Sequence, residues 1–133
     1  MSATRVKVKL TIEGEDLDPN IVTEKIGLTP NITHKRGEKL KNNRTRRHGS
    51  WGIIQEFEES YDISIQLNKL LGLITNKEDK LLYIKEMYSC TIIVSVIIEI
   101  ENKEVPGIVI EEGFSSLVSK IGADIDIDIY IMS

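Results

Sequence analysis

The sequence predicts an α+β fold, a mostly antiparallel sheet of four to five strands with two to four helices packed on one face. Residues 4–13 and 124–131 alternate polar and apolar side chains, which is typical of strands with one buried face. Residues 90–101 are apolar on both faces, as a central strand is. Segments with apolar residues at helical spacing lie between these strands, and we expect one α+β domain over residues 1–133.

The first and last strands carry rows of opposite charge. Because opposite charges across a ladder favour a register by roughly 0.2–1 kcal/mol per pair, we expect these strands to be adjacent and antiparallel. Without that pairing, the acidic row would form a protein-binding face. A metal site is disfavoured, since alternate carboxylates of one strand lie roughly 6.5–7 Å apart. The rows are Arg5, Lys7 and Lys9 in the first strand and Asp124, Asp126 and Asp128 in the last.

A short helix is expected after the first strand. Asp18 and Pro19 form a helix start, with aspartate as the N-cap and proline at the first helical position, where no N–H is needed. Gly27 supplies a left-handed residue that ends the helix, and Pro30 prevents its continuation.

Two strands are expected on either side of a basic stretch in the middle of the chain. Residues 33–37 form a short strand before it. After it, Trp51, Ile53 and Phe57 share one face of a strand, with Gln55 as a polar exception.

Further helices are expected in the second half of the chain. Ser60 or Asp62 caps the first of them, and Asn76 with Asp79 resembles a capping box for a short helix that runs through Met87. The predicted order is strand, helix, strand, strand, helix, a further short helix, strand, helix and strand. The apolar residues at helical spacing are Ile63, Leu67, Leu70, Leu71 and Ile74 early in this half, and Phe114, Leu117, Val118 and Ile121 near its end.

Composition restricts the class of protein. The apolar stretch Ile92–Ile98 is too short to span a bilayer, and no signal peptide is visible at the start. The single Cys90 excludes an internal disulfide, and its place in a strand predicts burial, which raises the pKa of a thiol. We therefore expect a cytoplasmic protein without a membrane segment. No catalytic constellation is visible, so we expect no enzymatic activity, cofactor or metal.

The charge is concentrated in one segment. Residues 34–48 contain seven Lys and Arg and one acid, a net charge of +6, whereas the remainder has ten cations against twenty acids, a net charge of −10. Clustered cations of this kind bind anionic groups. The candidate binding residues are His34, Lys35, Arg36, Lys39, Lys41, Arg44, Arg46, Arg47 and His48.

Several ligands fit this segment. An acidic protein surface is compatible with it, and so is a solvated loop without a partner. A small anion or nucleotide is compatible as well, with Lys35, Arg36 and the two bracketing histidines as ligands, and weak enzymatic turnover stays open for that alternative. Nucleic acid is disfavoured, because Trp51 is the only aromatic residue near the segment and the acidic remainder repels a polyanion. The two histidines are expected to be solvated. Homodimerisation through a free sheet edge stays open.

Several short motifs resemble the DUF4279 family, a small bacterial domain of unknown function. The resemblance covers nearly the whole chain and implies a compact α+β domain in a bacterial cytosol, without an activity or site residues to transfer. We expect a non-enzymatic binding domain that engages an acidic protein through residues 34–48, for example an immunity-like protein that neutralises a toxin. The motifs are Gly14-Glu15-Asp16-Leu17-Asp18-Pro19, Ile26-Gly27-Leu28-Thr29-Pro30, Lys35-Arg36-Gly37, Trp51, Leu70-Leu71, Ile121-Gly122-Ala123 and Asp126-Ile127-Asp128-Ile129-Tyr130.

Overall fold

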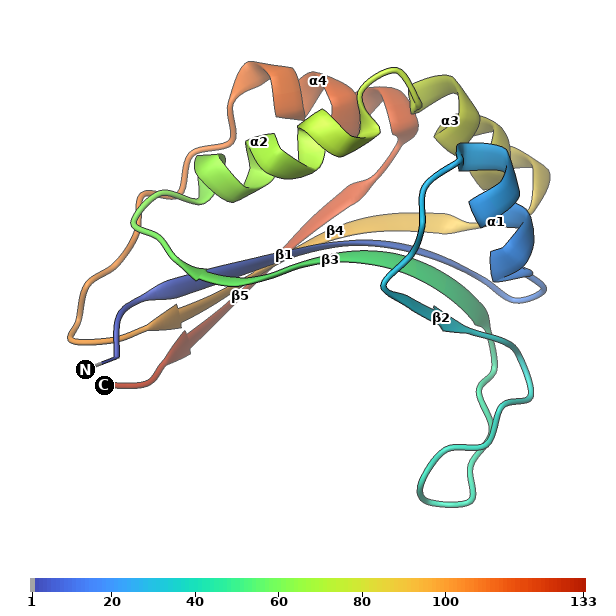
Figure 1. Cartoon of the computed structure of the whole chain (residues 1–133), viewed down its shortest axis with the longest axis horizontal. Coiled ribbons are helices and arrows are strands. Elements are labelled where there is room, and N and C mark those ends of the chain that lie inside the picture. Colours follow the sequence, from blue (N-terminus) through green and yellow to red (C-terminus); the bar gives the residue numbers. More distant parts are fainter. Residues whose placement is uncertain (1) are drawn as a thin grey trace.

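The computed structural model describes residues 2–133, which form a five-stranded mixed sheet with four helices along one face (Figure 1). The α+β fold, the order of the elements and the helices on one face are confirmed. The opposite face of the sheet, called the open face below, carries no helix (Figure 1). The elements are β1 (Arg5–Gly14), α1 (Pro19–Ile26), β2 (Ile32–His34), β3 (Gly49–Glu59), α2 (Ile63–Ile74), α3 (Glu78–Met87), β4 (Thr91–Ile100), α4 (Glu112–Ile121) and β5 (Asp124–Ile131).

The helix ends follow local capping chemistry in most cases. Asp18 accepts the N–H of Asn20 at 3.0 Å, and Gly27 ends α1 with a φ of 77°, both as predicted. Asp62, rather than Ser60, is the N-cap of α2 and accepts the N–H of Ser64 at 2.9 Å.

The predicted capping box before α3 is wrong. Lys77 occupies the N-cap position, without a capping side chain. Asn76 instead has a left-handed backbone, with a φ of 70°, in the turn after α2. It therefore lies one residue too early to cap α3, and Asp79 takes no part in such a box.

The strand order differs from the prediction. The sheet runs β2-β3-β1-β4-β5, with β1 antiparallel to both β3 and β4, and with β4 parallel to β5. The first and last strands are therefore not adjacent, and the sheet is mixed rather than mostly antiparallel. The helix α4 connects β4 to β5, and a helical crossover of this kind gives a parallel pair.

Burial explains why the charge rows do not pair. An ion pair across a ladder contributes roughly 0.2–1 kcal/mol, whereas burying one aliphatic side chain contributes roughly 1.5–3 kcal/mol. The central place next to β1 is taken by β4, whose Val94, Val96 and Ile98 are buried beneath the helices. Arg5 instead pairs with Glu99 of β4, and Lys7 Nζ lies 3.8 Å from a carboxylate oxygen of Glu56.

A bulge in β3 moves Phe57 to the open face. Val8 pairs with Gln55, but Val6 pairs with Glu58, so three residue steps along β3 correspond to two along β1. The additional residue reverses the alternation of β3. The prediction that Phe57 shares a face with Trp51 is therefore wrong, and its ring lies 4.2 Å from the guanidinium carbon of Arg5.

Trp51 fixes β3 beneath the helix layer. Its side chain is fully buried, and its indole N–H donates to Thr23 Oγ1 of α1 at 2.9 Å. The hydrogen bond satisfies the polar end of the ring inside the core. Among residues 2–133, no helix combines the length and the apolar character that crossing a bilayer requires.

Candidate binding surface: the basic arm

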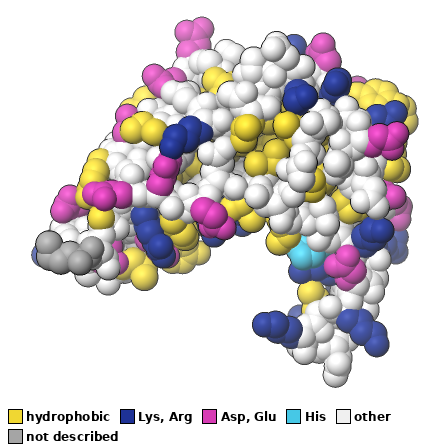
Figure 2. All heavy atoms as spheres, in the orientation of Figure 1, with side chains coloured by type: hydrophobic (Ala, Val, Ile, Leu, Met, Phe, Trp, Pro, Cys, Tyr) yellow, Lys and Arg dark blue, Asp and Glu magenta, His cyan; other side chains and the backbone are white. Residues whose placement is uncertain are grey.

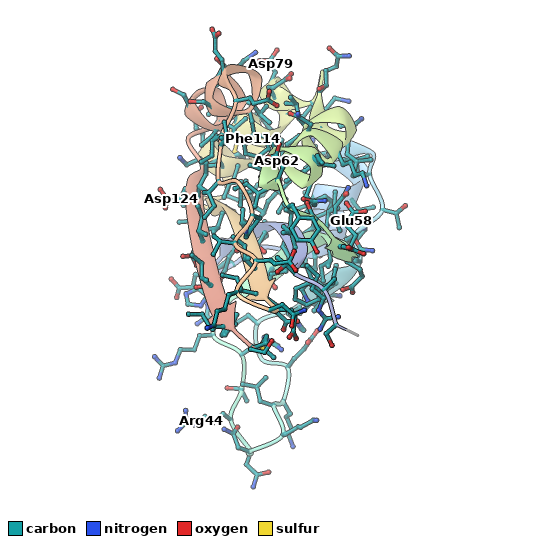
Figure 3. The ribbon with its side chains drawn as sticks, turned by 90° about the vertical axis from the view of Figure 1, so that its left-hand side faces the viewer. Arg44, Glu58, Asp62, Asp79, Phe114 and Asp124 are labelled. Carbon is teal, nitrogen blue, oxygen red and sulfur yellow. The ribbon has the colours of Figure 1, made fainter. Side chains whose placement is uncertain are left out.

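Residues 34–48, called the basic arm below, connect β2 to β3 at one edge of the sheet. The arm projects away from the helices, on the side of the open face (Figure 1). Lys and Arg side chains gather at its far end (Figure 2), where Arg44 lies (Figure 3). The most basic segment of the chain is therefore also the part that stands furthest from the core.

The outer part of the arm is a small hairpin. Leu40 N–H donates to the carbonyl of Arg44 at 2.7 Å, and Arg46 N–H donates to the carbonyl of Glu38 at 2.8 Å. Asn43 has a φ of 63° at the tip, as a tight turn requires. The predicted strand over residues 33–37 is shorter than expected, since β2 ends at His34 and the next part of the chain belongs to this hairpin.

Arg36 ties the base of the arm to the turn after β1. Its Nη1 lies 2.8 Å from Asp16 Oδ1 and 3.6 Å from Glu15 Oε1. Gly49 follows the arm directly and is buried, and a Cβ at this position would collide with the carbonyl oxygen of Leu17. The base of the arm is thus attached to the body by an ion pair and by close packing.

The two histidines lie at the base of the arm but face different acids. His34 Nδ1 is 3.5 Å from Glu38 Oε2, and His48 Nδ1 is 3.7 Å from Glu13 Oε1. The side chain of His48 is 48% exposed, as expected for a solvated histidine, whereas that of His34 is only 23% exposed. Glu38 also accepts the N–H of Lys35 at 2.9 Å. The single acid of the arm is therefore used within the arm.

Six of the seven Lys and Arg residues of the arm have no carboxylate within ion-pair distance anywhere in residues 2–133. Arg36 is the exception. Most of the six are exposed, and only Arg46 is partly buried. The positive charge of these six residues is therefore not neutralised by ion pairs with the acids of the body. The six are Lys35, Lys39, Lys41, Arg44, Arg46 and Arg47.

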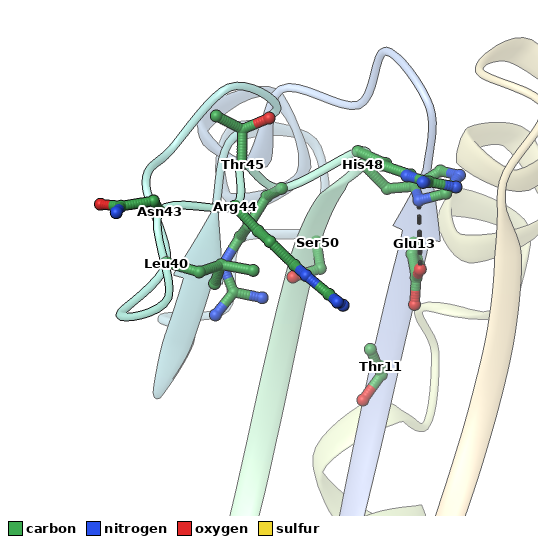
Figure 4. A pocket seen from close by; sticks show the side chains of 10 residues that line it. Thr11, Glu13, Leu40, Asn43, Arg44, Thr45, His48 and Ser50 are labelled. Carbon is green, nitrogen blue, oxygen red and sulfur yellow. Dashed lines mark ion pairs between the residues drawn. The ribbon is translucent and has the colours of Figure 1, made fainter.

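An open groove of about 1000 Å³ lies between the arm and the open face. Thr11 of β1 and Ser50 of β3 form its sheet side, and the arm forms the other (Figure 4). The carboxylate of Glu13 also lines the groove, next to His48. The arm residues in the lining are Leu40, Asn43, Arg44, Thr45, Arg46, Arg47 and His48.

The sheet side of this groove was not predicted from the sequence. Strand alternation places Thr11 and Glu13 on the polar face of β1, but their position beside the arm depends on the pairing of β1 with β3. Ser50 faces the groove because it follows the arm directly at the start of β3. No local pattern contains that long-range information.

Among residues 2–133, three groups outside the arm have displaced pKa values. Burial, followed by nearby acids, raises the pKa of the Tyr61 hydroxyl. Burial raises the pKa of the Cys90 thiol, as predicted, so this cysteine is a poor nucleophile. Hydrogen bonds from Lys69 and then Gln66 lower the pKa of the Glu58 carboxyl, which lies 2.8 Å from Lys69 Nζ. The contacts of Glu58 link β3 to α2. Within the described residues, no three His, Cys, Asp or Glu side chains converge in a way that could hold a metal ion.

Comparison with known proteins identifies the family of the chain. The model of a family described as a domain of unknown function, DUF4279, matches residues 4–132. No curated protein and no solved structure matches the chain.

Proposed function

The chain belongs to the DUF4279 family, and from the geometry of the arm we propose that it is a non-enzymatic binding protein that engages an acidic surface of a protein partner. The six cations of the arm that lack an acid partner within residues 2–133 carry this proposal. The electrostatic field of a cation without an internal partner is not cancelled by a nearby carboxylate, so it acts on a ligand. Complementary charge accelerates association and selects the partner. The concrete form we propose is an immunity-like protein that neutralises a toxin with an acidic patch.

A protein surface fits the arm better than a small anion does. The cations are spread over both strands and the tip of the hairpin, whereas a small anion needs several donors that converge on one point. The groove is also open, and the Glu13 carboxylate within it would repel an anion. A broad acidic patch can contact the exposed cations without entering the groove.

Nucleic acid fits less well for two reasons. None of the groove residues is Phe, Tyr or Trp, so no large aromatic platform for base stacking lies beside Arg44, Arg46 and Arg47. A long polyanion would also extend beyond the arm and over the remainder of the chain, which carries a net charge of −10.

Charge reversal of the arm tests the proposal. The variant Arg44→Glu, Arg46→Glu and Arg47→Glu is compared with a matched control of the same change in net charge, Lys25→Glu, Lys80→Glu and Lys103→Glu, at exposed positions outside the arm. Both proteins, with the wild type, serve as baits in lysate of the native host. We expect the wild type and the control to retain one protein partner, and the arm variant to lose it. Equal recovery on the arm variant would contradict the proposal.

Native mass spectrometry of the freshly purified protein distinguishes the small-anion alternative. A phosphate compound bound in stoichiometric amount to the wild type would favour the small-anion alternative over a protein partner. Binding to nucleic acid would instead appear as an affinity that falls steeply with salt.

A further inference from the structure

The strand β5 is a free edge of the sheet, at the side opposite the arm. It is eight residues long and pairs on one side only, with β4. Figure 3 shows it along the outside of the sheet, with Asp124 at its start. The other edge strand, β2, is only three residues long. The long unpaired edge is therefore the principal place where this sheet can gain a strand.

The direction of the free backbone groups follows from the ladder. Met132 N–H donates to the carbonyl of Ile100 in β4 at 2.9 Å. Backbone groups of successive strand residues point to alternate sides, so the even-numbered residues of β5 bond to β4. The N–H and C=O groups that point away from the sheet therefore belong to Ile125, Ile127, Ile129 and Ile131.

The side chains of β5 form two rows along this edge. The aspartates lie on the open face, opposite Ile93, Ser95 and Ile97 of β4. The isoleucines lie on the helix face and become more exposed along the strand, with Ile129 at 49% and Ile131 at 79%. The acidic row has no cation within ion-pair distance among residues 2–133. It consists of Asp124, Asp126 and Asp128.

A second copy of the same strand does not fit this edge. Antiparallel pairing of two β5 strands places aspartates of one copy opposite or diagonal to those of the other, and facing like charges are destabilising. The same acidic row favours a strand with cations at alternate positions. The unpaired main chain provides the hydrogen bonds, and the charge row selects the sequence.

We propose that β5 binds an extended segment of a partner protein in which Lys or Arg alternates with aliphatic residues. The cations of the segment lie over the aspartate row, and its aliphatic residues extend the isoleucine row. The chain itself contains this pattern in β1, but both edges of β1 are already paired, with β3 and β4. This site is independent of the basic arm, since it uses the other edge and the opposite charge.

Two synthetic peptides of identical composition test the proposal on the intact protein. One alternates lysine and valine over eight residues, and the other contains the same residues as a block of lysines followed by a block of valines. The probe is fluorescence anisotropy of each labelled peptide with the wild-type protein. We expect the alternating peptide to bind more tightly, because only it places all its cations on one face of a strand. Equal affinity of the two peptides would overturn the proposal.

Variants of β5 distinguish the contribution of main-chain hydrogen bonds to peptide binding from that of the aspartate row. Ile129→Pro removes one outward N–H and leaves the ladder with β4 intact, whereas Ile129→Val keeps that donor. We expect the proline variant to bind the alternating peptide roughly 2- to 12-fold more weakly than the valine variant. Replacing the three aspartates by asparagine, a change that preserves shape, weakens binding by roughly 3- to 150-fold.

Two results would contradict this assignment. One is unchanged affinity in the asparagine variant, which needs no assumption about the folding of the proline variant. The other is a molecular mass of the unliganded protein that rises with concentration in light scattering and returns to the monomer in Ile129→Pro but not in Ile129→Val, because a second copy would then occupy the edge through its main chain.

Discussion

The two edges of the sheet carry opposite charges, one on a projecting hairpin and the other on a strand that packs against the core. At the β2 edge, the cations lie on a hairpin that leaves the body, and six of them lack an acid partner within residues 2–133. At the β5 edge, the aspartates alternate with isoleucines, of which Ile125 and Ile127 pack against the core. The cations of the arm therefore do not contribute to core packing, whereas β5 carries the acidic row and also packs isoleucines against the core. Changes at the arm should alter binding alone, and changes along β5 should alter stability as well.

The largest expected effect is at the base of the arm, where the body ends and the arm begins. Trp51 is fully buried in β3 and pairs with Thr33 of β2. Trp51→Ala removes its packing and leaves a cavity, so we expect a loss of about 3–5 kcal/mol in the free energy of unfolding, measured in urea. As a control, Thr23→Ser keeps the acceptor of the indole N–H and should cost far less. A loss below about 1 kcal/mol in Trp51→Ala would show that core packing next to the arm contributes little to stability.

The next effect is at the β5 edge. Ile127 is partly buried against the core, so Ile127→Ala should lower the free energy of unfolding by about 1–2 kcal/mol, less than at a fully buried isoleucine. Asp126→Asn, the neighbouring position on the open face, should change it by less than about 0.5 kcal/mol. Equal effects at both positions would remove the distinction between the two rows of this strand.

A smaller effect is expected from pH, at the contact between the sheet and α2. Hydrogen bonds from Lys69 and Gln66 lower the pKa of Glu58 in the folded protein below its ordinary value of 4.5. A carboxyl with a lowered pKa contributes stability that is present above the unfolded pKa and is lost as the pH falls through the folded one. We therefore expect the stability difference between wild type and Glu58→Gln to be constant from pH 7 to about pH 5 and to shrink below pH 4.5. A difference that grows on acidification would contradict the sign.

The smallest effect on stability is expected in the arm itself. The triple reversal Arg44→Glu, Arg46→Glu and Arg47→Glu should change the free energy of unfolding by less than about 0.5 kcal/mol, because these side chains make no ion pair within residues 2–133. Thermal unfolding followed by circular dichroism measures this change. A marked loss of stability would mean that the arm side chains stabilise the fold, and would contradict the proposed difference between the two edges.

The elements could be predicted from the sequence because their signals are local. Asp18, Pro19 and Gly27 mark the ends of α1 within one turn of the residues that they cap. The pairing of strands is a long-range property, and the complementary charges of the terminal strands suggested the wrong neighbours. Apolar burial of β4 exceeds what three exposed ion pairs can contribute. The bulge that turns Phe57 to the open face likewise leaves no local pattern.

The candidate site could be predicted in composition but not in shape. The nine candidate binding residues of the arm are visible as a charge cluster. That Arg36 pairs with Asp16, and that Glu13 enters the groove, depends on a turn and a strand far away in the sequence. The free edge at β5 became apparent only when the strand order was known.

A two-dimensional nuclear magnetic resonance titration of the ¹⁵N-labelled protein tests the contrast between the edges most directly. The protein is titrated separately with a short oligoglutamate peptide and with the alternating lysine–valine peptide. The account predicts that the acidic peptide shifts the amide signals of residues 39–47 and that the basic peptide shifts those of Ile125–Ile131. Shifts from both peptides at the same residues, or from the acidic peptide outside the arm, would contradict it.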